Sequence, residues 1–149
     1  MRFRAILAVA VLAACSRADA PASDTTAMGG DTSAVSASPW SGMWDVRVMP
    51  EGRDTTLTTY VLNTTDAANW TFSFPNREPI AMRQTGTSGD TVMTESGPFE
   101  SALRPGQMVS VTAKNWIENG VLRGLTTARY QNAGADSVAT LRHEGTKRP

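Results

Sequence analysis

Apolar and polar residues alternate along the chain from Trp40 onward, the period of two that a half-buried β-strand produces. In "GMWDVRV", residues 42–48, a tryptophan and two valines fall on one side, and an aspartate and an arginine fall on the other. In "NWTFSF", residues 69–74, Trp70, Phe72 and Phe74 alternate with a threonine and a serine. These two runs predict the best-defined strands of the domain.

Six weaker runs continue the series and are separated by short turn-forming segments rich in Gly, Pro, Asn and Asp. They cover residues 55–63, 79–86, 91–96, 107–116, 121–130 and 137–143. The pair Asn119 and Gly120 between two of them is a strong hairpin signal, since both positions of a type I′ turn need a positive φ. No run has the periodicity of a helix, so the sequence predicts an all-β domain of eight strands.

The short links between these strands predict antiparallel neighbours, because a parallel crossover needs a dozen or more residues. Eight such strands can close into an up-and-down barrel or fold into a sandwich. We favour the eight-stranded antiparallel barrel, because closure removes unpaired strand edges.

The stretch "GDTVMT" has two relatives at the same offsets, "RDTTLT" and "ADSVAT", which place Asp54, Asp90 and Asp136 before predicted strands. Successive turns of an up-and-down sheet alternate between its two ends, so these three carboxylates cannot all meet. The repeat is therefore interpreted as a way of starting a strand, with each aspartate closing an Asx-turn, and not as a ligand site.

Composition excludes several classes of site. The chain of 149 residues has fourteen basic and fourteen acidic residues without long runs of one sign, which argues against nucleic-acid binding. One cysteine and one histidine cannot build a zinc or other soft-metal cluster. We expect no metal and no other cofactor.

Catalytic signatures are also missing. The sequence has no Gly-x-Ser-x-Gly elbow, phosphate loop or dinucleotide fingerprint. His143 lacks a partner nearby in the sequence, so we predict that it lies at the surface. Glu95 and Glu100 flank a Gly-Pro turn and are predicted to face solvent. The protein is therefore not expected to be an enzyme.

The N-terminus reads as a targeting segment. Arg2 and Arg4 precede an apolar run at residues 5–14, which is too short to span a bilayer and typical of a secretory signal peptide. The run ends in "LAAC", residues 12–15, which resembles the lipobox of bacterial lipoproteins. That resemblance implies cleavage before Cys15 and acylation of this residue, and Ser16 after it implies delivery to the outer membrane. The alternative is an ordinary signal peptide with an incidental cysteine.

Three segments follow from this pattern. Residues 1–14 form the predicted lipoprotein signal peptide, and residues 15–38 form the lipidated cysteine and a flexible tether poor in large apolar groups. Residues 39–149 form the β-barrel domain. We expect the mature protein to be held at the periplasmic face of the outer membrane by its lipid anchor.

The motif "WSGMW" at residues 40–44 resembles the Gly-x-Trp opening of lipocalins. That resemblance implies that Trp44 closes the floor of a barrel, and it makes Arg142 of the last strand the nearest candidate to stack on the Trp44 ring. The domain departs from the family in being short and in lacking a terminal helix and a second lipocalin motif.

Two functions remain open. The barrel either binds a small apolar or amphipathic molecule, with Trp44, Trp70, Phe72 and Phe74 as candidate ligand-binding residues, or is filled by these side chains. Small residues at inward-capable positions favour an internal volume: Thr59, Ala113, Gly124, Thr126 and Ala139. A filled barrel would act as a structural or interaction protein and present its loops, notably "GPFESALRPG" at residues 97–106, to another envelope component.

Overall fold

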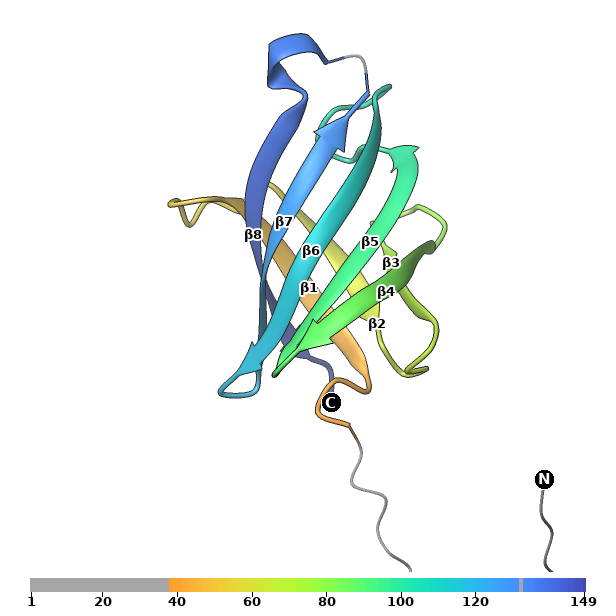
Figure 1. Cartoon of the computed structure of the whole chain (residues 1–149), viewed down its shortest axis with the longest axis vertical. Coiled ribbons are helices and arrows are strands. Elements are labelled where there is room, and N and C mark those ends of the chain that lie inside the picture. Colours follow the sequence, from red (N-terminus) through yellow and green to blue (C-terminus); the bar gives the residue numbers. More distant parts are fainter. Residues whose placement is uncertain (1–37, 132) are drawn as a thin grey trace, which may run out of the picture. The chain divides into compact units, whose positions relative to one another are not determined.

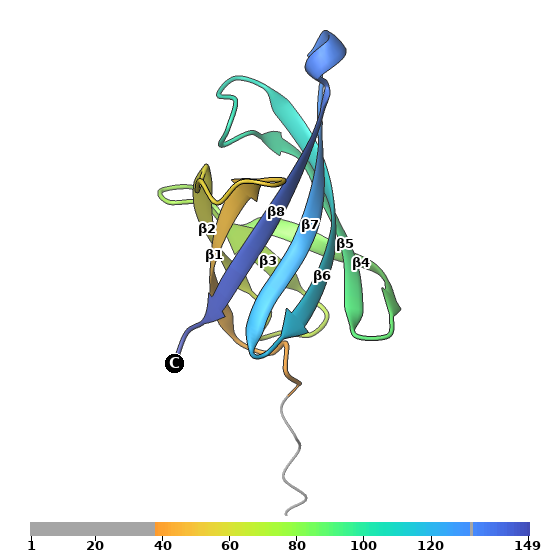
Figure 2. The same cartoon turned by 90° about the vertical axis from the view of Figure 1, so that its left-hand side faces the viewer.

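The domain is a closed barrel of eight antiparallel strands in sequential order, in which β8 pairs with β1 (Figures 1 and 2). The computed structural model describes residues 38–131 and 133–149. The strands are β1 (Met43–Pro50), β2 (Thr58–Asn63), β3 (Trp70–Ser73), β4 (Ile80–Ser88), β5 (Thr91–Glu100), β6 (Met108–Glu118), β7 (Val121–Tyr130) and β8 (Val138–Lys147). The predicted all-β barrel is confirmed, and the sandwich alternative is wrong because the β1–β8 ladder closes the sheet.

The period-two pattern places the core as expected. In β1, Trp44, Val46 and Val48 are buried and the residues between them are exposed. The hairpin between β6 and β7 turns at Asn119 and Gly120, both with positive φ. Among the described residues, no helix is long and apolar enough to cross a membrane.

The two ends of the barrel differ in the links that they hold. The floor is the end where residues 38–42 enter, and it also holds the β2–β3 link, the β4–β5 and β6–β7 hairpins and the C-terminus (Figure 1). The rim is the opposite end and holds the other links, including residues 101–107 between β5 and β6. The links that contain Asp54 and Asp136 lie at the rim, whereas Asp90 lies at the floor, as the alternation of turns predicts.

The floor is closed by Trp44, which is 1% exposed. Its indole Nε1 donates to the carbonyl oxygen of Trp40 at 3.1 Å and to Thr64 Oγ1 at 3.3 Å. Trp40 in turn packs against Trp70, with ring centroids 5.4 Å apart. The amine of Lys147 lies 5.5 Å from the centroid of the Trp44 ring. The floor is therefore sealed by aromatic packing around a satisfied indole N–H.

The hydrogen-bonded ladders are uneven in length. Neighbouring strands from β5 to β8 are paired over most of their lengths. The β2–β3 ladder covers only Val61–Asn63 on β2, and the β3–β4 ladder covers only Trp70–Phe72 on β3. One side of the barrel is therefore held by long ladders and the other side by short ones.

The wall is also split between β4 and β5 toward the rim. Their pairing ends at Arg83 and Glu95, although β4 begins at Ile80 and β5 continues to Glu100, and the two strands diverge in Figure 1. The β5–β6 register shifts between Ser96 and Phe99. A β-bulge of this kind bends its strand, so β5 leaves β4 at this point.

Gly97 makes this bulge compatible with the sheet. It has φ 108, and a Cβ atom there would lie 2.7 Å from the backbone oxygen of Val109. Residues 97–100 of the predicted 97–106 loop belong to β5, so the link between β5 and β6 consists of residues 101–107.

Candidate functional site

A layer of buried polar side chains crosses the interior above the floor. His143 on β8 is 2% exposed, and its Nε2 lies 3.0 Å from Oδ1 of Asn115 on β6. Its Nδ1 lies 3.0 Å from Oγ1 of Thr126 on β7. The Asn115 amide nitrogen donates to the Val92 carbonyl oxygen and to Thr94 Oγ1, each at 3.1 Å. These contacts join four strands through one hydrogen-bonded layer.

The layer fixes the proton positions on the imidazole. The Val92 carbonyl can only accept, so the Asn115 amide nitrogen must face it and Oδ1 must face the histidine. His143 Nε2 therefore carries the hydrogen, and Nδ1 accepts from the Thr126 hydroxyl. Burial lowers the pKa of His143 to about 4, so the ring is neutral near pH 7.

The prediction that His143 lies at the surface is wrong. Along β8 the buried positions alternate, and His143 shares the inward face with Leu141 and Gly145. The ring fits because Gly124 on the neighbouring strand has no side chain at the point of contact. The imidazole is held by two hydrogen bonds in the interior, which stabilises the barrel.

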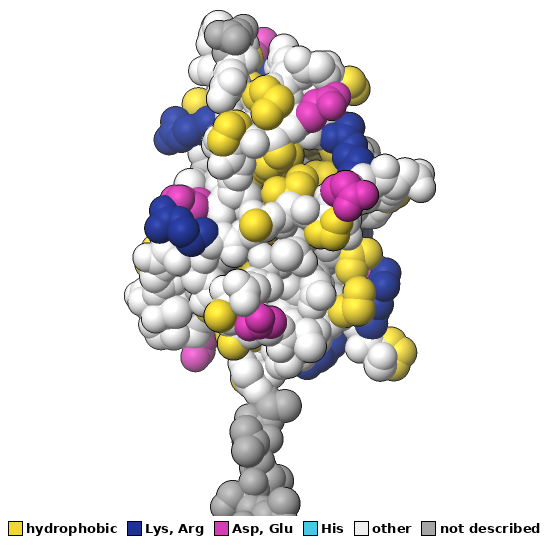
Figure 3. Space-filling model, turned by 90° about the vertical axis from the view of Figure 1, so that its right-hand side faces the viewer, with side chains coloured by type: hydrophobic (Ala, Val, Ile, Leu, Met, Phe, Trp, Pro, Cys, Tyr) yellow, Lys and Arg dark blue, Asp and Glu magenta, His cyan; other side chains and the backbone are white. Residues whose placement is uncertain are grey.

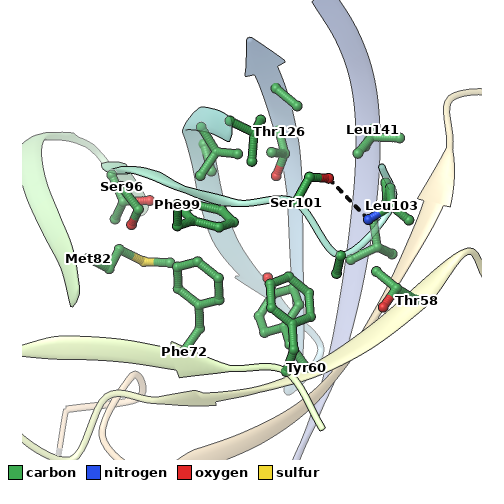
Figure 4. Close-up of a pocket in the computed structure, with 18 of the residues that line it drawn as sticks. Thr58, Tyr60, Phe72, Met82, Ser96, Phe99, Ser101, Leu103, Thr126 and Leu141 are labelled. Atoms are coloured by element: carbon green, nitrogen blue, oxygen red, sulfur yellow. Dashed lines mark hydrogen bonds between the residues drawn. The ribbon is translucent and has the colours of Figure 1, made fainter. Parts of the chain in front are cut away.

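A cavity of about 80 Å³ lies between this polar layer and the rim (Figure 4). Thr94, Asn115 and Thr126 line its lower side, and aliphatic and aromatic side chains line the rest. Tyr60, Phe72, Phe74 and Phe99 form an edge-to-face and tilted aromatic cluster with centroid separations of 5.4–6.4 Å: Tyr60–Phe72, Tyr60–Phe74, Phe72–Phe74, Phe72–Phe99 and Phe74–Phe99. Burial raises the pKa of the Tyr60 phenol, which stays neutral.

The β5–β6 link covers the cavity at the rim. Ser101 is 2% exposed, and its hydroxyl accepts from the backbone N–H groups of Leu103 and Arg104 at 3.1 and 3.0 Å (Figure 4). The Arg104 guanidinium lies 4.1 Å from the Tyr130 ring centroid and donates to the Asp136 carbonyl oxygen at 2.8 Å. The cover is therefore tied both to itself and to the β7–β8 link.

One side of the cavity meets the split between β4 and β5. Met82, Ser96 and Phe99 line the cavity where the two strands separate, and they lie on one side of the pocket in Figure 4. Figure 3 shows apolar side chains gathered at a hollow in the upper part of the face that carries these strands. Ser96 is 8% exposed, and its hydroxyl has no hydrogen-bond partner among the described residues.

The structure divides the four aromatic residues that the sequence suggested for ligand binding. Phe72 and Phe74 line the cavity. Trp44 and Trp70 lie at the floor, below the polar layer, where they pack with Trp40. The cavity thus receives its other aromatic rings from Tyr60, Phe99 and Tyr130, which sequence reasoning did not single out.

The small residues also divide between the two faces of the wall. Ala113 and Thr126 line the cavity, whereas the space beside Gly124 is occupied by the His143 ring. Ala139 packs in the small apolar cluster near the rim. Thr59 is exposed and faces outward.

Arg142 and the three aspartates make other contacts than the sequence predicts. Arg142 does not lie on the Trp44 ring; it faces outward and pairs with Asp54 and Glu144, and Lys147 stands over the ring instead. Asp54 therefore binds a side chain, and the predicted Asx-turns at Asp54, Asp90 and Asp136 are not seen in the described chain.

Turns of this kind form elsewhere, at Asn63 and Asp66, whose side chains accept from backbone N–H groups two residues on. Glu100 faces solvent as predicted and accepts from the Gly106 N–H at 3.2 Å. Glu95 is partly exposed at the edge of the cavity and pairs with Arg83.

An ion-pair cluster spans the outer face where the barrel closes. Glu144 on β8 contacts Arg47 of β1 at 2.6 Å, Arg123 of β7 at 3.0 Å and Arg142 at 3.3 Å. The hydrogen bond from Arg47 is the largest cause of the lowered pKa of the Glu144 carboxyl. The cluster links three adjacent strands and lies outside the cavity.

Comparisons with protein-family models, with curated proteins and with solved structures found no match to this chain. The cavity, the polar layer beneath it and the split in the wall beside it form the candidate site.

Proposed function

We propose that this protein is a lipid-anchored lipoprotein of the bacterial envelope whose barrel binds a small apolar or amphipathic molecule. The observation that carries the proposal is the internal cavity, which is lined by aromatic and aliphatic side chains above a polar layer whose groups are already paired. A pocket with mostly apolar lining and few polar groups is the usual form of a small-molecule site.

The volume limits what fits. The cavity volume is about 80 Å³. It is well below the roughly 300 Å³ or more of a pocket for a drug-sized ligand. The cavity in this conformation therefore suits a short alkyl segment or the end of a longer chain.

The proposed cellular location is based on the N-terminal sequence pattern. The signal peptide and Cys15 lie outside the described residues, so their support is the "LAAC" pattern after a short apolar run. Acyl chains on Cys15 would hold the protein on a membrane, with no nucleic-acid partner involved. We propose the periplasmic face of the outer membrane as its place and a non-enzymatic role for it.

Native mass spectrometry of the full chain purified from its source bacterium tests the binding function. We expect a reproducible bound mass that the variant Ala113→Leu loses, because Ala113 lines the cavity and a leucine would occupy much of its volume. Ala81→Leu is the matched control, since Ala81 is exposed on β4. A bound mass that Ala113→Leu retains would place the ligand outside the cavity and contradict the proposal.

The anchor has its own test. Cys15→Ser should abolish incorporation of radiolabelled palmitate, because the modified thiol and the new N-terminus are both lost when the lipobox cysteine is replaced. Ser16→Ala should keep the label and serves as the control. Labelling that persists in Cys15→Ser would refute acylation at this residue.

The small volume also favours a second candidate function, a filled barrel that presents its rim to another envelope protein. The rim link at residues 101–107 is ordered by Ser101 and Arg104, as an interaction surface requires. If this second function is correct, no small molecule copurifies with the protein, and neither Ala113→Leu nor Ala81→Leu changes the mass spectrum beyond the substitution itself.

A further inference from the structure

One buried group in the cavity wall is left without a bonding partner. Ser96 is 8% exposed, and no described residue bonds its hydroxyl. Buried hydroxyls are normally paired, because an unpaired one destabilises the fold. On β5 the buried residues Val92, Thr94 and Ser96 alternate with less buried ones, so Ser96 shares the inward face, and it lines the cavity.

The other buried Ser, Thr and Asn side chains that line the cavity already make hydrogen bonds within the barrel. Thr94 Oγ1 accepts from Asn115, both polar atoms of the Asn115 amide are bonded, and Thr126 Oγ1 bonds the histidine. The Ser101 hydroxyl accepts from two backbone N–H groups. Among the described residues that line the cavity, Ser96 is the one whose side-chain polar atom is both fully buried and without a hydrogen bond.

The position of Ser96 defines how a ligand would lie. It stands at the split, where β5 has left β4 and Met82 lines the facing side. The aromatic cluster around Phe72 lies deeper in the barrel. A polar head at Ser96 would thus leave an apolar tail against the aromatic rings.

The charges at the split indicate a neutral head. Of the described residues that line the cavity, Glu95 alone is charged, and its carboxylate is paired with Arg83. A carboxylate ligand would find no cation in the lining, and an ammonium ligand would have to displace Arg83. Because an unpaired charge is costly to remove from water, the lining discriminates against both.

We infer that Ser96 is the recognition residue of the cavity and binds the hydroxyl or carbonyl head of a neutral amphipathic molecule whose alkyl end occupies the cavity. The inference rests on the proposed function, because it requires that the cavity takes a ligand.

The test compares 1-butanol, n-pentane and butanoate at pH 7 on the full chain, labelled with ¹³C at the methionine methyl groups. The Met82 methyl signal reports binding, since Met82 lines the cavity, and Met82→Leu assigns it. In the wild-type chain, 1-butanol and n-pentane should shift this signal and butanoate should not. Ser96→Ala should weaken 1-butanol binding roughly threefold to tenfold and leave n-pentane within about twofold, because only the alcohol bonds the hydroxyl.

Ser73→Ala is the matched control, because Ser73 lies on the opposite face of its strand from the buried Phe72. It should change neither affinity. If Ser96→Ala changes 1-butanol and n-pentane binding equally, the role of Ser96 is overturned while the binding function stands. If butanoate binds as tightly as 1-butanol, the neutral-head specificity is overturned. If no probe shifts Met82 in the wild-type chain, the binding function fails and this inference fails with it.

Discussion

Gly124→Ala is expected to lower the free energy of unfolding by about 3 kcal/mol or more. A Cβ atom at this position would overlap the His143 ring and lie 2.5 Å from the backbone oxygen of Lys114. The ring cannot move aside easily, because both of its nitrogens are hydrogen-bonded within the barrel. The Lys114 oxygen belongs to a strand paired along its length with β7. Urea unfolding followed by tryptophan fluorescence measures the loss.

Gly86→Ala is the control for this prediction. Gly86 also lies in a strand, has no positive φ, and an added Cβ atom would meet only the flexible Met93 methyl at 3.1 Å. Its stability should change by less than about 1 kcal/mol, since alanine also restricts the unfolded chain. Equal losses in the two variants would show that the contact with His143 is not what requires a glycine.

The second large effect is a loss of stability on mild acidification. Burial lowers the pKa of His143 from 6.5 to about 4, so between these pH values the unfolded chain binds a proton that the folded chain does not. The contribution of the neutral imidazole to the free energy of unfolding is therefore fully present above about pH 6.5. Below that value the free energy of unfolding falls by about 1.4 kcal/mol per pH unit. The total reaches roughly 3 kcal/mol near pH 4.

Urea unfolding at pH 7, 6 and 5 measures this slope, and the chain has one histidine, so no second imidazole contributes. The ring contacts Asn115, Thr126 and Gly124, whereas neighbouring Glu144 pairs with arginines on the outer face. The lowered pKa values of the Asp45, Asp66 and Glu144 carboxyls add a loss of stability only at lower pH. That loss develops as the pH falls toward the pKa of each carboxyl in the folded protein. His143→Gln should flatten the slope above pH 5, and a flat wild-type curve there would contradict the effect of burial on His143.

Alternation and turn chemistry were sufficient to predict the eight strands, because a period of two reports directly which face of a strand is buried. The same rule also applies to β8. His143 is two residues from Leu141 and Gly145, so period two assigns it to the inward face. Its isolation from other chemistry-bearing residues in the sequence was misleading, since Asn115 and Thr126 reach it across neighbouring strands. Arg142, one residue away, necessarily faces outward, and Lys147 is in phase with the inward set.

The cavity itself could not be predicted from the sequence. Its depth depends on which aromatic rings rise above the polar layer, and Trp44 and Phe72 look equivalent as inward residues of strands. Both residues even pair with Leu62 across their ladders, yet only Phe72 lines the cavity. The role of Ser96 could not be predicted either, because the bulge after it is a property of the β5–β6 pairing and not of local composition.

The uneven ladders have a mechanical consequence. Short hydrogen-bonded segments open at lower free energy than long ones, so local opening should concentrate at β2, β3 and β4 while β5 to β8 stay paired. Phe72 and Met82 lie on the short-laddered side, and Ala113 and Thr126 lie on the long-laddered side. We therefore expect the cavity, which has a volume of about 80 Å³ in this structure, to expand by movement of the short-laddered strands.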